Sequence, residues 1–241
     1  MPHPQVSAVL FDMDGLLIDS ERLYTVASNE LLAPYGKELT WELKSQLMGR
    51  PAHDSAARLI EATGIPMTVD ELLPTMDQKL DSLFRTVEPL PGVVKLVHHL
   101  EKHKVPMAIA TGSKTRNFKI KSAHLPHLFD SFSTNILCGD DPILEGKGKP
   151  DPTIFIKAAE MLGYSTPEER AKVLVFEDGV SGVQAARAAG MEGKWSCTFV
   201  WIPDPELVST LGSDHGLNAS HQHSSMEDFD PAAWGLPPYD S

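Results

Sequence analysis

Short apolar runs recur along the chain, and stretches with a helical spacing of apolar residues lie between most of them. The runs predict five buried strands, at residues 6–11, 105–110, 135–138, 173–176 and 198–202. Between the last four runs, apolar residues recur every three or four positions, which is typical of amphipathic helices. Strands that alternate with helices indicate an α/β fold, a doubly wound, Rossmann-like parallel sheet with right-handed crossovers.

Residues 18 to 88 follow a different pattern, with four helix-like segments and no strand between them. Thr68 and Glu71 have capping-box spacing and predict the start of the fourth helix, which Pro74 should break or kink early. We therefore expect a small all-helical cap domain at residues 18–88, inserted into an α/β core domain made of residues 1–17 and 89–241.

Polar side chains follow three of the predicted strands. They form three pairs: Asp12 with Asp14, Thr111 with Ser113, and Glu177 with Asp178. Because parallel strands bring their carboxyl ends to one edge of a sheet, we expect the pairs to meet there. Carboxylate oxygens suit Mg²⁺, and hydroxyls suit phosphate oxygens. Taken singly, each pair also fits a turn or a helix cap, so the prediction depends on their joint occurrence.

Lys149 lies in a glycine-containing segment directly before a predicted helix that Asp151 would cap. A lysine at this place can neutralise a phosphate or a nucleophilic carboxylate. A solvent-exposed loop cation is the alternative interpretation. The segment is not a nucleotide-binding P-loop, because Pro150 occupies the position of the required Ser or Thr.

Composition and charge narrow the class of partners. The chain has 241 residues, 41% of them hydrophobic, and a net charge of −12, which argues against nucleic acid or an anionic membrane as a partner. No apolar stretch reaches the length of a membrane span. Cys138 and Cys197 lack disulfide or zinc spacing, and residues 1–5 lack the features of a signal peptide. We therefore expect a cytoplasmic protein.

Four motifs occur in a characteristic order: FDMDG at residues 11–15, ATGS at 110–113, GKPDP at 148–152 and VFED at 175–178. In these motifs the chain resembles the haloacid dehalogenase superfamily of phosphoryl-transfer enzymes. The segment between the first and second motifs is similar to the small helical cap of that family. The resemblance implies a magnesium-dependent phosphatase with a capped Rossmann-like core.

The resemblance also implies roles for individual residues in catalysis. Asp12 would be the nucleophile that forms an aspartyl-phosphate, and Asp14 would be the general acid and base. Thr111 and Lys149 would hold the phosphoryl oxygens, and Ser113 is a further candidate for binding the substrate.

A set of acidic residues would hold the metal. The resemblance implies that Asp12, Asp178 and the backbone carbonyl of Asp14 bind Mg²⁺ directly. Glu177 would support the ion through water. The metal and Lys149 would together screen the repulsion between the attacking carboxylate and the phosphate dianion.

A narrower resemblance concerns the substrate. The stretches at residues 11–24, 139–142 and 235–239 resemble the pseudouridine-5′-phosphatase-like branch of the superfamily. This resemblance implies an enzyme that acts on a small phosphorylated metabolite, such as a nucleoside or sugar phosphate, with pseudouridine 5′-phosphate as one candidate. We expect the protein to be a monomer.

Substrate choice should depend on residues of the cap, which must close over the phosphate and exclude water. Arg50 is the best candidate for reaching the substrate, with His53 and Glu21 behind it. A surface cation ahead of a helix is the alternative interpretation of Arg50.

Two other functions remain open at this point. A sugar phosphomutase of the β-phosphoglucomutase type uses the same pair of carboxylates but returns the phosphoryl group to the sugar. A non-catalytic module that binds phosphorylated metabolites is the third hypothesis. Release of inorganic phosphate with Mg²⁺ would favour the phosphatase over both.

Two histidines have a spacing that can also bind a metal ion. His99 and His103 are four residues apart, as in some zinc sites, but the flanking Lys102 and Lys104 repel a cation and no acidic third ligand has suitable spacing. We interpret the two histidines as part of a solvated helix face. The polar residues 212–230 are expected to form a loop.

Overall fold

The core of the molecule is a five-stranded parallel sheet. The computed structural model describes residues 5–47, 52–190, 192–193, 196–197, 199–211 and 221–240. The strand order is β3 (Ile136–Cys138), β2 (Met107–Thr111), β1 (Ala8–Phe11), β4 (Val173–Glu177) and β7 (Phe199–Trp201), and all four neighbouring pairs are parallel. The expected α/β fold is confirmed.

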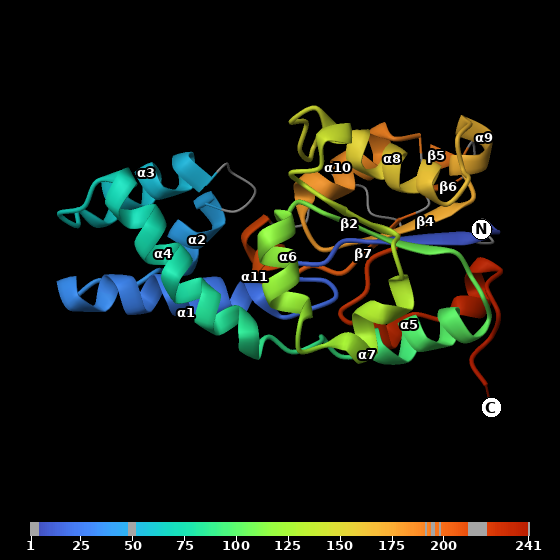
Figure 1. Ribbon diagram of the computed structural model, residues 1–241, viewed down its shortest axis with the longest axis horizontal. Helices are drawn as coiled ribbons and strands as arrows, with labels where there is room; N and C mark the ends of the chain where they lie inside the picture. The colour runs from blue at the N-terminus through green and yellow to red at the C-terminus, as the bar shows by residue number, and fades with distance from the viewer. Residues whose placement is uncertain are drawn as a thin grey trace.

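Helices cover both faces of the sheet, as Figure 1 shows. Val9 and Phe11 of β1 pack into one hydrophobic cluster, whereas Ala8 and Leu10 pack into another, which is the period of two expected for a strand. The first cluster includes residues of α5 (Val93–Lys102) and α7 (Pro126–Phe129), and the second includes residues of α8 (Thr153–Met161) and α10 (Val180–Ala188). Because both faces are buried, the sheet strands are apolar almost throughout.

Four consecutive helices lie at one end of the molecule (Figure 1). They are α1 (Ser20–Leu32), α2 (Trp41–Leu47), α3 (Ala52–Thr63) and α4 (Val69–Leu83). These helices contribute to a hydrophobic cluster of their own that includes Leu31, Leu43, Leu59 and Leu72. The arrangement agrees with a helical cap, although the domain boundaries at residues 17/18 and 88/89 stay a prediction.

The start of α4 is fixed by a capping box. Thr68 N donates to Glu71 Oε2 at 2.8 Å, and Glu71 N donates to Thr68 Oγ1 at 3.3 Å. Pro74 lies inside the helix, so the expected early break was wrong, whereas a kink at this residue stays a prediction. Burial of Leu72 before the proline and of Leu80 after it favours a continuous helix, since tertiary packing can outweigh a local preference.

The other helices and strands connect these parts. They are α6 (Thr115–Ser122), α9 (Pro167–Arg170), α11 (Pro205–Leu211), the short strands β5 (Glu192–Gly193) and β6 (Ser196–Cys197), and 3₁₀ turns at Ala33–Tyr35, Phe84–Thr86, Asp130–Phe132, Pro142–Leu144, Met226–Asp228 and Pro231–Trp234. In the part of the chain that the structure describes, no helix combines the length and the hydrophobicity needed to cross a bilayer.

The C-terminal segment packs against the core. Within the predicted loop 212–230, the described residues 221–230 run beside the edge of the sheet: Trp201 N donates to His221 O at 2.9 Å, and His223 N donates to Trp201 O at 3.0 Å. Residues 212–220 lie outside the described residues. The segment is therefore held to β7 by backbone hydrogen bonds, which local composition does not reveal.

His99 is buried against Pro237 and Tyr239, further along the C-terminal part of the chain. Its Nε2 donates to Pro237 O at 2.8 Å, and the residue is 7% exposed, so the expectation that it belongs to a solvated helix face was wrong. Asp240 also lies near His99 and His103, an acidic neighbour that the local spacing did not indicate. Lys102 Nζ donates to Asp240 Oδ2 at 2.6 Å and already neutralises that carboxylate.

Candidate active site

Three carboxylates meet where β1 and β4 end. The two strands are parallel neighbours, with Phe11 opposite Phe176, so the residues that follow them lie side by side. Asp12, Glu177 and Asp178 each offer an oxygen, and these oxygens lie within 4.8 Å of one another. The cluster is the kind of hard oxygen donor set that Mg²⁺ prefers.

Lys149 reaches the same cluster from the loop before α8. Its Nζ donates to Glu177 Oε1 at 2.7 Å and forms a second ion pair with Asp12 Oδ1. Asp151 holds the loop at the start of α8, since its Oδ1 accepts a hydrogen bond from Thr153 N at 2.9 Å. The lysine is therefore fixed between two carboxylates that come from adjacent strands.

Burial and mutual repulsion change the acidity of this cluster. Burial, with Glu177 and Asp14 adding to it and Lys149 opposing it, raises the pKa of Asp12 to about 7. Burial and the neighbouring Glu177 and Asp12 also raise the pKa of Asp178 well above its usual value. Burial works against the charge of Lys149, but Asp12 and Glu177 more than compensate and raise the pKa of the lysine. A divalent cation would relieve the excess of negative charge, so the donor set fits Mg²⁺.

The side chain of Asp14 is directed to other partners. Its Oδ1 accepts hydrogen bonds from Ser20 Oγ at 2.6 Å and Lys121 Nζ at 2.5 Å, and its Oδ2 accepts one from Ser113 Oγ at 2.6 Å. Burial opposes ionisation of Asp14, but Lys121 and these hydrogen bonds hold its pKa below the usual value. The two aspartates of the first motif thus differ in environment, which is how one site can assign different chemical roles to two carboxyl groups.

The hydroxyls of Thr111, at the end of β2, and of Ser113, just after it, lie next to Asp14. Thr111 is fully buried and its Oγ1 accepts a hydrogen bond from Ser113 N at 3.0 Å, while Ser113 Oγ is the donor to Asp14 described above. The structure therefore brings both residues to the edge of the sheet that carries the carboxylates. Their contact with a phosphate stays a prediction.

A pocket of about 220 Å³ opens beside Asp178 of the carboxylate cluster. Among its lining residues are Glu21 at the start of α1, Lys44 of α2 and Asp178 of the core. Lys44 Nζ lies 3.8 Å from Glu21 Oε2. Burial raises the pKa of Glu21, with Lys44 opposing the shift. The pocket therefore places a charged pair from the cap next to the carboxylate cluster.

The other two candidates from the cap are placed differently. The side chain of His53 is 71% exposed and lies 4.0 Å from Asp54, and His53 does not line the pocket beside the carboxylates. Arg50 lies outside the described residues. Their roles in substrate binding stay predictions.

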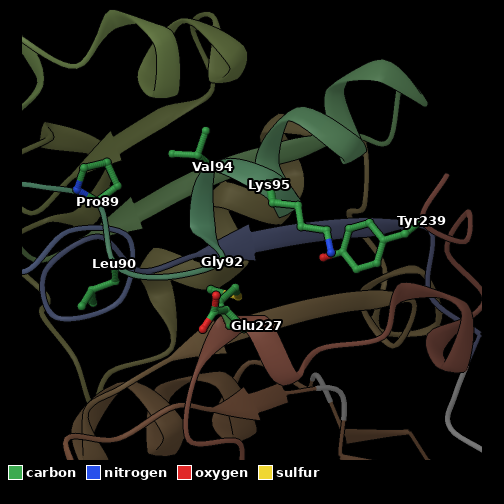
Figure 2. Close-up of a pocket in the computed structure, with 8 residues that line it drawn as sticks. Pro89, Leu90, Gly92, Val94, Lys95, Glu227 and Tyr239 are labelled. Carbon is green, nitrogen blue, oxygen red and sulfur yellow. The ribbon is translucent and has the colours of Figure 1, made fainter. Parts of the chain in front are cut away.

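A second pocket lies away from this chemistry, between the start of α5 and the C-terminal segment (Figure 2). Its lining includes Leu90, Lys95, Glu227 and Tyr239 but none of the clustered carboxylates. Figure 2 shows Lys95 extended toward the ring of Tyr239, with Nζ 4.1 Å from the ring centroid. We therefore expect the reaction to take place beside the pocket of about 220 Å³ that Asp178 lines.

Sequence reasoning missed Lys121, which is fully buried and contacts Asp14. The signal was a lysine one helical turn after an apolar residue. Lys121 is three residues after Phe118 on α6, and Phe118 packs against the core. A charged residue on a buried face must have a partner, and here the partner is the second aspartate of the first motif.

Gly182 of α10 gives Glu177 the space it occupies. A Cβ added at residue 182 would lie 1.6 Å from Glu177 Oε1. We therefore expect Gly182→Ala to displace this carboxylate from Lys149 and to weaken the binding of Mg²⁺ by about tenfold, the range seen when groups that orient metal ligands are altered. Isothermal titration with MgCl₂ measures the effect.

Gly148→Ala is the matched control, because nothing lies within 4 Å of an added Cβ there. It should bind Mg²⁺ as the wild type does. Equal affinity in Gly182→Ala and the wild type would show that the position of Glu177 does not matter for the ion.

The comparisons with known proteins agree with this geometry. A family model of haloacid dehalogenase-like hydrolases matches residues 6–190. The chain is 39% identical over 244 residues to a probable pseudouridine-5′-phosphatase of Saccharomyces cerevisiae, a match that covers 98% of this chain and 100% of the relative. It is 38% identical over 237 residues to (DL)-glycerol-3-phosphatase 2 of Arabidopsis thaliana, covering 98% and 93% of the two chains.

A solved structure supports the fold alone. A HAD family hydrolase from Deinococcus radiodurans R1, with bound phosphate and sodium, superposes with a TM-score of 0.75 at 24% identity, covering 97% of this chain and 99% of the other.

Because the family model and the relatives match most of its length, the chain belongs to the haloacid dehalogenase-like hydrolases. The resemblance to the pseudouridine-5′-phosphatase-like branch and the class of phosphoric monoester hydrolase are confirmed.

Proposed function

We propose that this protein is a magnesium-dependent phosphatase that hydrolyses a small phosphomonoester through an aspartyl-phosphate on Asp12. The observation that carries the proposal is the junction of Asp12, Asp178 and Glu177 with Lys149 at the end of adjacent strands. A buried group of acids with a single lysine suits a cation and a phosphoryl group together.

In this mechanism Asp12 attacks phosphorus and the bond to the leaving alcohol breaks. Asp14 gives a proton to the leaving oxygen and later takes one from the water that hydrolyses the aspartyl-phosphate. Lys149 stabilises the negative charge on the transferred group, and Thr111 and Ser113 are placed to bind its oxygens. Asp12, Asp178 and the carbonyl of Asp14 would hold Mg²⁺, with Glu177 acting through water. The bound ion supplies positive charge that lowers the repulsion between carboxylate and phosphate.

The substrate belongs to the small phosphorylated metabolites in this proposal. One of the relatives described above is named as a probable pseudouridine-5′-phosphatase, and another as a glycerol-3-phosphatase. The pocket of about 220 Å³ suits an alcohol of that size better than a polymer. Glu21 and Lys44 would bind hydroxyls of the leaving alcohol, because both are polar cap residues that line this pocket.

A panel of phosphate esters tests the proposal. It contains glycerol 3-phosphate, ribose 5-phosphate and pseudouridine 5′-phosphate as alkyl esters, and 4-nitrophenyl phosphate as an aryl ester. We expect release of inorganic phosphate with MgCl₂ and none with excess EDTA. An isomerised sugar phosphate with little free phosphate would instead support a mutase, and no turnover of any ester would contradict the proposal.

Binding of Mg²⁺ should also raise the free energy of unfolding. We expect MgCl₂ at about 100 times its Kd to stabilise the wild type by about 2.7 kcal/mol, since the ion binds the folded state. Asp178→Asn should lose most of this gain, because it removes one carboxylate from the cluster. Thermal unfolding with and without MgCl₂ measures both. An equal Mg²⁺-dependent shift in Asp178→Asn would contradict the assignment of this ligand.

A further inference from the structure

Lys121 is a buried cation without a role in the mechanism above. It lies near the end of α6 and has no exposed surface, and its Nζ donates to Asp14 Oδ1 at 2.5 Å and to Ser113 Oγ at 3.0 Å. A buried ammonium is costly unless it is paired, so the contact with Asp14 determines where this side chain lies.

Aromatic rings hold the lysine from the side of the cap. Nζ lies 4.2 Å from the ring centroid of Phe84, which follows α4, and 5.5 Å from that of Tyr24 in α1. The two rings pack edge to face with their centroids 5.5 Å apart. Cation–π contacts of this kind, together with complete burial, leave the ammonium little freedom to move.

The partners of Asp14 differ in what they contribute. Ser20, Ser113 and, at 3.5 Å, Thr111 contact Asp14 through hydroxyls that can rotate, whereas Lys121 supplies the charged contact. All of these hydrogen bonds reach a carboxylate, but Lys121 adds the attraction of a full positive charge to its own. The lysine is therefore the strongest single contact that orients the Asp14 carboxyl group.

We propose that Lys121 is a positioning residue for proton transfer by Asp14, an inference that rests on the proposed function. Lys121 pairs with the carboxylate form of Asp14, which is the form that accepts a proton from the water that attacks the aspartyl-phosphate. The carboxyl group formed in this way gives that proton to the leaving oxygen of the next turnover, when the bond between phosphorus and that oxygen breaks. Lys121 itself neither gains nor loses a proton.

The leaving group provides the test. The ratio kcat/KM covers the steps up to departure of the leaving group, and 4-nitrophenolate departs without help from an acid, whereas an alkoxide needs one. We expect Lys121→Met to lower kcat/KM at least about tenfold for the alkyl esters of the panel and by less than about threefold for 4-nitrophenyl phosphate. A merely structural role would lower both alike, and that result would overturn the proposal.

A double variant keeps the test valid if Lys121→Met is unstable. Asp14→Asn/Lys121→Met removes both charges of the pair, so it leaves neither one buried alone. If the lysine acts through Asp14, this variant should match Asp14→Asn within about threefold on every ester. A further loss of tenfold or more would overturn the proposal. Lys119→Met, on the exposed side of the same helix, is the control and should match the wild type.

A wild type that hydrolyses none of the esters is a separate outcome. It would contradict the proposed function. A wild type that hydrolyses both ester types, combined with equal losses in Lys121→Met, would overturn only the role of the lysine.

Discussion

Asp12→Asn should lower phosphatase activity by at least about 10⁴-fold, because an amide cannot form the acyl-phosphate that the mechanism requires. The substitution changes the shape of the side chain little. Burial already raises the pKa of Asp12, so a neutral group at this position is compatible with the fold. Lys149 keeps its ion pair with Glu177 in this variant, so we expect a thermal midpoint within a few degrees of the wild type. Steady-state release of phosphate with MgCl₂ measures the loss.

The control for this variant is Asp54→Asn. Asp54 lies on α3 with its side chain 62% exposed, and the same change there should leave activity within about twofold. Turnover by Asp12→Asn above about one hundredth of the wild-type rate would mean that another group attacks the phosphate.

Lys149→Met should affect both stability and activity. The change leaves Asp12 and Glu177 without the ammonium that they share, and breaking a buried ion pair in this way costs about 3–5 kcal/mol. For a chain of this size the loss corresponds to a fall in Tm on the order of 10 °C. The rate should fall about 10²-fold or more, because the lysine also stabilises the transferred phosphoryl group. Thermal unfolding and initial rates measure the two effects.

The effect of Mg²⁺ on the Tm of Lys149→Met distinguishes an electrostatic cause of the lower stability from misfolding. In Lys149→Met the ion can take over part of the missing positive charge, so the loss of Tm should be smaller with MgCl₂ than with EDTA. Lys147→Met is the control, because its side chain is half exposed and its pair with Glu145 spans 3.5 Å. A loss of Tm that is the same with and without the ion would contradict the electrostatic explanation.

The fold could be predicted from the sequence because its signals are local and repeated. The apolar runs before Asp12 and Glu177 are strands β1 and β4, and the capping box at Thr68 and Glu71 forms as expected. Where the prediction of an element was wrong, tertiary contacts explain the difference. Pro74 stays within α4, where the side chains of Leu72 before it and Leu80 after it are buried.

Only part of the candidate site could be predicted from the sequence. Strand ends indicated which carboxylates meet, because the topology of a parallel sheet brings them to one edge. The partner of Asp14 was not visible, since Lys121 is 107 residues away and only packing brings the two together. The burial of His99 depends on Pro237, 138 residues further along, and was missed for the same reason.

Chemical trapping of the phosphorylated residue tests the central claim most directly. The Asp14→Asn variant should be mixed with 4-nitrophenyl phosphate and MgCl₂, because loss of the base slows hydrolysis of the intermediate while this leaving group departs unaided. Borohydride reduces an acyl-phosphate, so after quenching and digestion mass spectrometry should find homoserine in place of Asp12. A burst of 4-nitrophenol with residue 12 unmodified would contradict the account.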